Sequence, residues 1–180
     1  MTAPEYIQLR AFARFDGLKL FGLWLASFAC YVAGLKWAGM GTLAMLLALF
    51  TPFLVARLLR NFRDDGLDGA ISFGRGWAYV VFLFFYASLL FAVAQYAYFA
   101  YLDKGFFIST LTQQFNSPET KEAMKQMGMS ETLNETMQLL RTMRPIDLVL
   151  NIMTSNLLIG IVLGLPIAAF GKRERIEKVK

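Results

Sequence analysis

The sequence has no histidine and a single cysteine, Cys30, among its 180 residues. Without histidine the chain lacks the usual acid-base group near neutral pH and the commonest ligand of transition metals. One cysteine cannot form a disulfide within the chain. Paired carboxylates, metal-ligand clusters and a nucleophile beside a base are also missing from the sequence. We therefore predict a protein that is not an enzyme and that uses neither a metal nor another cofactor.

Charged residues are also scarce, and apolar residues replace them. Only 17% of the residues are charged, whereas 57% are hydrophobic, and the mean hydropathy is +0.47. An average soluble domain has about 25% charged residues. This composition is typical of a membrane protein, so we expect membrane lipids as partners and no nucleic acid.

Four apolar segments are long enough to cross a membrane, which takes about 20 residues as a helix. They predict transmembrane helices over residues 18–35, 38–56, 77–102 and 146–170. Only a few residues separate the first two segments, which requires an antiparallel hairpin. The predicted fold class is all-α: a polytopic membrane protein with four transmembrane helices in two antiparallel hairpins, forming one domain over residues 1–180.

The two ends of the chain carry basic residues. Thr2 and Glu5 have the spacing of a capping box and predict a short interfacial helix over residues 1–16, and residues 171–180 form a basic tail. Because Lys and Arg concentrate on the cytoplasmic side of membrane proteins, both termini are expected to be cytoplasmic. That side would then carry Arg10, Arg14, Lys19, Arg57, Arg60, Arg63, Arg75, Lys172, Arg173, Arg175, Lys178 and Lys180.

Residues 103–144, between the third and fourth spans, form the predicted extracytoplasmic loop. Ser117 followed by Pro118 is typical of a helix start, and Leu133 and Met137 recur at helical spacing. We expect one or two short amphipathic helices here. Their apolar faces would either cover the outer ends of the membrane helices and the headgroup layer, or bind an extracytoplasmic partner.

The sequence DDGLDGAISFGRGW at 64–77 comes close to a phosphate-binding loop, but it has Arg75 where such a loop has Lys, and no Ser or Thr follows. Two interpretations stay open. Ser72 caps the third membrane helix in a plain glycine-rich turn. Alternatively, the backbone N–H groups near Gly74, with Arg75 and Arg63, bind the phosphate of an anionic lipid.

Polar residues inside the predicted spans form the second candidate site. Polar side chains at membrane depth are rare and often functional. They either form hydrogen bonds between the third and fourth helices or line a small polar pocket for a lipid headgroup or a solute. The residues are Gln95, Asn151, Thr154, Ser155 and Asn156.

Small residues at four-residue spacing form two seams that allow close helix packing. Each seam either packs inside the chain or faces another subunit. The first seam is Gly22, Ala26, Cys30 and Gly34, and the second is Asn156, Gly160 and Gly164.

The four spans, the motif Gly69-Ala-Ile-Ser-Phe-Gly74, the Tyr101-Leu-Asp103 end of the third span and Pro145 opening the fourth resemble one family. It is a bacterial domain-of-unknown-function family, number forty-one ninety-nine, of integral inner-membrane proteins. The family has no established activity, and the resemblance implies an inner-membrane location and an accessory role beside a membrane sugar transferase acting on polyprenyl phosphate.

Two functions follow as hypotheses. The first is a non-enzymatic accessory or scaffold subunit that binds a membrane-protein partner or forms a homo-oligomer. The alternative is a small transporter or lipid-handling protein that uses the polar residues of the third and fourth helices.

Overall fold

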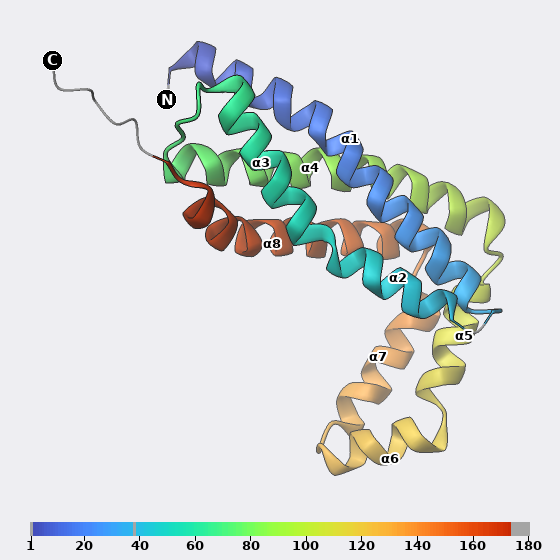
Figure 1. The fold of residues 1–180 in the computed structure, drawn as a ribbon. Helices are drawn as coiled ribbons and strands as arrows, with labels where there is room; N and C mark the ends of the chain where they lie inside the picture. The colour runs from blue at the N-terminus through green and yellow to red at the C-terminus, as the bar shows by residue number, and fades with distance from the viewer. Residues whose placement is uncertain (1, 38, 174–180) are drawn as a thin grey trace, which may run out of the picture. The chain divides into compact units, whose positions relative to one another are not determined.

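The computed structural model describes residues 2–37 and 39–173, which fold almost entirely into helices (Figure 1). Helices Ala3–Gly34, Met40–Gly66, Phe73–Leu102 and Pro145–Gly171 are long and apolar enough to cross a membrane. The predicted all-α, four-span architecture is confirmed. The elements are α1 (Ala3–Gly34), α2 (Met40–Leu49), α3 (Thr51–Gly66), α4 (Phe73–Ala97), the π-helical turn η1 (Tyr98–Leu102), α5 (Phe106–Phe115), α6 (Pro118–Gln126), α7 (Ser130–Thr142) and α8 (Pro145–Gly171).

Helix α1 is continuous: the interfacial helix predicted over residues 1–16 and the first predicted span, residues 18–35, form a single helix, Ala3–Gly34. The backbone N–H of Thr2 donates to the Glu5 carboxylate at 2.7 Å, so the helix begins where the capping box lies. Gly17 does not interrupt it. A Cβ at Gly17 would lie 3.0 Å from Cβ of Tyr86, so this glycine permits α1 and α4 to cross closely.

The second candidate membrane-spanning segment consists of two helices, α2 and α3, which join at Thr51 and Pro52. Proline lacks an N–H group and is tolerated in the first turn of a helix, where it fits the start of α3. Gly39, with φ of 94°, begins α2 after the short turn from α1. A Cβ on Gly34 would lie 2.6 Å from the backbone nitrogen of Gly41, so glycine at this point lets the two helices of the hairpin meet.

The chain divides into two compact units. The larger comprises Met1–Ala92 with Ile152–Lys180, and the smaller comprises Val93–Asn151. The core of the larger unit lies where α1, α3, α4 and α8 face one another. Its buried residues are Leu9, Ala13, Leu20, Trp24, Val55, Leu58, Leu59, Phe62, Ile71, Tyr79, Val80, Leu83, Phe84, Ala87, Phe91 and Ile167.

The smaller unit contains three short helices, α5, α6 and α7, where one or two were predicted. Asp103 caps α5, because its carboxylate accepts from the Phe107 N–H at 3.0 Å. Ser117 caps α6 by accepting from the Thr120 N–H at 3.3 Å, as its position before Pro118 predicted. Leu133 and Met137 of α7 are both buried, which agrees with their helical spacing.

Candidate functional site: an apolar pocket in the helix bundle

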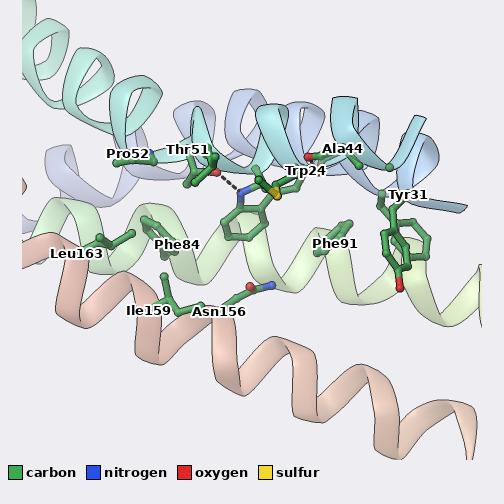
Figure 2. A pocket seen from close by; sticks show the side chains of 16 residues that line it. Trp24, Tyr31, Ala44, Thr51, Pro52, Phe84, Phe91, Asn156, Ile159 and Leu163 are labelled. Atoms are coloured by element: carbon green, nitrogen blue, oxygen red, sulfur yellow. Dashed lines mark hydrogen bonds between the residues drawn. The ribbon is translucent and has the colours of Figure 1, made fainter. Parts of the chain in front are cut away.

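A pocket of about 760 Å³ lies within the larger unit, enclosed by α1, α2, α3, α4 and α8 (Figure 2). Its volume is in the range of sites that bind small molecules. Almost all of its walls are apolar or aromatic, and none of the described residues that line it is charged. The lining residues are Trp24, Ser27, Phe28, Tyr31, Gly41, Ala44, Met45, Ala48, Leu49, Thr51, Pro52, Phe84, Phe91, Asn156, Ile159 and Leu163.

Trp24 forms the centre of the pocket wall. Its indole N–H donates to the Thr51 hydroxyl at 3.1 Å, and its ring centroid lies 5.5 Å from that of Phe84 and 5.7 Å from that of Phe91. A buried indole N–H needs such a partner, and aromatic rings at these separations attract one another. The side chain of Trp24 is therefore held from two sides, by the α2–α3 junction and by α4.

The pocket opens sideways, between α2 and α8. Met45 and Leu49 of α2 line it and are 62% and 58% exposed, and Ile159 of α8 lines it and is 49% exposed. Residues that are both lining and exposed mark the rim. Because α2 and α8 both belong to segments that are long and apolar enough to cross a membrane, this opening would face the hydrocarbon when those segments span it.

Polar groups in the pocket are few, and most bond to the protein itself. The Ser27 hydroxyl donates to the Ala44 carbonyl at 2.8 Å, and Trp24 and Thr51 bond to each other. Asn156 is half-buried, and its amide makes no hydrogen bond within the described part of the chain. Figure 2 shows this amide on the side of α8 that faces Trp24.

The predicted polar residues differ in their surroundings. Asn156 lines the pocket, whereas its neighbours Asn151, Thr154 and Ser155 are exposed. Successive residues of a helix point about 100° apart, so positions 155 and 156 belong to different faces. Gln95, in the smaller unit, is 3% exposed, and its side-chain oxygen has no hydrogen-bond partner among the described residues.

The two small-residue seams have different surroundings. A Cβ on Gly160 would lie 2.4 Å from Cγ of Phe84, and one on Gly164 would lie 3.0 Å from Cδ1 of Trp77, so the α8 seam packs inside the bundle. On α1, Gly34 meets Gly41, but Gly22 and Ala26 are exposed and Cys30 is half-buried. This part of the α1 seam faces outward.

The glycine-rich turn between α3 and α4 contains the cap that the sequence predicted. Ser72 accepts from the Arg75 N–H at 3.4 Å through its hydroxyl and from the Gly76 N–H at 3.0 Å through its carbonyl. Asp68 and Gly69 both have positive φ, and Gly74 has open space beside it.

The two arginines of the predicted phosphate site bond to different parts of the protein. Arg75 donates to the Glu5 carboxylate at 3.2 Å and to the Gln8 side chain at 3.1 Å. Arg63 binds Asp64 at 2.7 Å and donates to the Gly171 carbonyl at 3.3 Å. These contacts connect α4 with α1, and α3 with α8. A cleft of about 520 Å³ beside the turn is lined by Arg75 and Ser72 but not by Arg63.

A buried carboxylate that the sequence analysis missed lies between α1 and α4. Asp16 is 5% exposed, accepts from the Tyr79 hydroxyl at 2.6 Å and forms an ion pair with Lys19 at 2.7 Å. The spacing of Asp16 and Lys19 on one helix face was visible in the sequence. Nothing in the sequence pairs Asp16 with Tyr79, which lies 63 positions away. In the described part of the chain, no group of three or more His, Cys, Asp or Glu side chains is placed to hold a metal ion.

The four apolar helices and the laterally open pocket define a multi-pass α-helical membrane protein. The chain belongs to the family described as protein of unknown function (DUF4199), whose model matches residues 16–173, and the resemblance noted in the sequence is confirmed. No curated protein and no solved structure matches the chain.

Proposed function

We propose that this protein binds a membrane lipid by inserting the lipid's apolar part into the pocket between α2 and α8, and that it does so without chemistry of its own. The observation that carries the proposal is the pocket itself: about 760 Å³ of apolar space, with exposed residues of two candidate membrane spans at its rim. Moving an apolar chain from the hydrocarbon of the membrane into an apolar pocket releases little free energy. The binding free energy therefore comes from close packing of the chain against the aromatic walls.

The arrangement of the polar residues supports lipid binding over solute transport. A transport site for a polar solute needs several polar groups that converge on one point. Here only Asn156 among the predicted polar residues lines the pocket, and Asn151, Thr154 and Ser155 are exposed elsewhere on α8.

The proposal is tested by filling the pocket. Ala48 lines it on α2, so Ala48→Phe places a ring in the space that the lipid would occupy. A variant with Trp37→Phe and Trp77→Phe retains Trp24 as its one tryptophan, which can be excited selectively. Phosphatidylcholine with brominated tails should quench Trp24 in this variant, and Ala48→Phe should remove most of that quenching. Val93→Phe is the control, because Val93 is 65% exposed on α4. Equal quenching in all three proteins would show that the pocket holds no lipid.

A second candidate, the accessory subunit, is favoured by the exposed polar residues of α8. Asn151 and Ser155 are exposed on a helix that spans the membrane. Hydrocarbon offers these side chains no hydrogen-bond partner, whereas a helix of another protein does. The partner that the family resemblance implies is a membrane sugar transferase acting on polyprenyl phosphate.

Co-expression with such a transferase tests this second candidate. Asn151→Leu combined with Ser155→Val should abolish co-elution in mild detergent, while Asn156→Leu, on the pocket side of the same helix, should leave it intact. If both variants still co-elute with the transferase, or if both lose it, a partner bound at the side of α8 that carries Asn151 and Ser155 is contradicted.

A further inference from the structure

We infer that the lipid bound in this pocket is an isoprenoid quinone, whose ring carbonyl pairs with the amide of Asn156 while its ring lies among the aromatic walls. The inference rests on the proposed function, because it names the class of lipid that the same pocket takes. Three observations carry it: the Asn156 amide, which lies deep in α8 without a hydrogen bond among the described residues, the aromatic lining, and the absence of charge among the lining residues.

Asn156 lies deep in the membrane-spanning part of α8. The helix has 27 residues and is about 40 Å long at 1.5 Å per residue, against a hydrocarbon core of about 30 Å. Asn156 follows Pro145 by eleven positions, which places it roughly 16 Å from that end of the helix. The polar groups of a phospholipid stay near the membrane surface, so they do not reach this amide.

The Asn156 amide nonetheless needs a hydrogen-bond partner. It offers two N–H donors and a carbonyl acceptor, and it makes no hydrogen bond within the described residues. A polar group left unpaired in apolar surroundings is destabilising. A saturated chain cannot satisfy it, so the ligand carries a hydrogen-bonding group at this depth.

The walls around Asn156 select the shape and charge of that group. Aromatic side chains from α1 and α4 surround the space, and aromatic rings favour stacked or edge-on contact with another flat ring. Lys, Arg, Asp and Glu are all missing from the described residues that line the pocket, so a charged headgroup would be unpaired there. A neutral, flat, carbonyl-bearing ring with a long apolar tail meets all three conditions. The aromatic lining residues are Trp24, Phe28, Tyr31, Phe84 and Phe91.

Quenching of Trp24 by decylubiquinone tests the inference in the single-tryptophan protein described above. We expect saturable quenching, a roughly tenfold weaker apparent affinity in Asn156→Leu, which corresponds to one lost buried hydrogen bond, and no change in Asn151→Leu, whose residue is exposed. Asn156→Gln keeps the amide and should retain more affinity than Asn156→Leu. Thermal unfolding of each variant shows whether it is folded.

The outcomes separate this inference from the proposed function. In one outcome, Ala48→Phe removes the quenching of Trp24 by brominated phosphatidylcholine but does not change the quenching by decylubiquinone. The pocket then binds lipid, and the inference of a quinone is wrong. If Asn156→Leu binds decylubiquinone as tightly as the parent, Asn156 does not recognise the ring. If neither probe depends on Ala48, both the proposed function and the inference fail.

Discussion

At the scale of single residues, the buried contact between Asp16 and Tyr79 contributes to stability. Both side chains are buried in the larger unit, and the Tyr79 ring also stacks on Phe62 with centroids 4.6 Å apart. A hydrogen bond to a buried charged group is stronger than one at the surface, and its loss leaves the carboxylate short of a donor.

We expect Tyr79→Phe to lower the free energy of unfolding by about 1.5–3 kcal/mol, measured by denaturant titration in detergent. Tyr86→Phe is the matched control, because the Tyr86 hydroxyl accepts from Arg10 at 3.3 Å at an exposed position. That variant should change the free energy of unfolding by less than about 1 kcal/mol. Similar losses of unfolding free energy in the two variants would show that the buried hydrogen bond to Asp16 is no stronger than the exposed one to Arg10.

The polar side chains on α8 show what the sequence could predict for single residues and what it could not. The sequence identified Asn151, Thr154, Ser155 and Asn156 as unusual, because polar groups at membrane depth are unusual anywhere. Which of them faces inward depends on how α8 is rotated against α4. The close approach of Gly160 to Phe84 is what orients the helix, and a single sequence does not show that contact.

At the scale of elements, glycines on two helices of this chain have opposite roles. We expect Gly160→Ala to destabilise the protein, because its Cβ would lie 2.4 Å from Phe84 and force α8 away from α4. Overpacking of this kind costs about 1–3 kcal/mol. Gly22→Ala should be neutral or stabilising by up to about 1 kcal/mol, since nothing lies within 4 Å of the new atom and alanine favours helix. Thermal unfolding of the two variants in one detergent compares them. A stabilised Gly160→Ala would contradict the internal packing of the α8 seam.

The turn between α3 and α4 yields a prediction of a different kind. Arg75 already bonds to Glu5 and Gln8, so Arg75→Gln should loosen the contact between α1 and α4. The expected loss in the free energy of unfolding is small, because the Glu5 side chain is 41% exposed and exposed ion pairs contribute little. Retention of anionic lipid, measured by native mass spectrometry, should stay unchanged if the arginine has this structural role. A marked fall in anionic-lipid retention would instead favour the phosphate site.

The elements that the sequence predicted well are those defined by local signals. Length and apolarity located all four spans, and Ser72 and Ser117 are caps in the structure as they were in the sequence. The continuity of α1 was not predictable in this way. The sequence defined the helix over residues 1–16 and the first span by separate signals, and the structure joins them into one helix in which Gly17 lies against Tyr86.

The pocket belongs to the scale of the whole bundle and has no counterpart in the sequence. Its lining residues lie on five helices, α1, α2, α3, α4 and α8, and are spread along the sequence between Trp24 and Leu163. No sequence motif connects these segments. Apolar residues inside spans are expected in any membrane helix, so their convergence on an open space is visible only after the helices are placed. The single polar signal was Asn156, and the sequence grouped it with the exposed polar residues beside it.

At the scale of the whole molecule, the sequence predicts that the four spans cross the membrane in turn, with both termini on one side and the loop over residues 103–144 on the other. The distribution of Lys and Arg predicts that the termini are cytoplasmic. In a Cys30→Ala background, Ala123→Cys on α6 should react with a membrane-impermeant maleimide in intact cells. Ala3→Cys should react only after lysis. Both positions are exposed, so access differs only through the membrane. Reversed labelling would invert the predicted orientation, and equal labelling of the two sites in intact cells would contradict the four crossings.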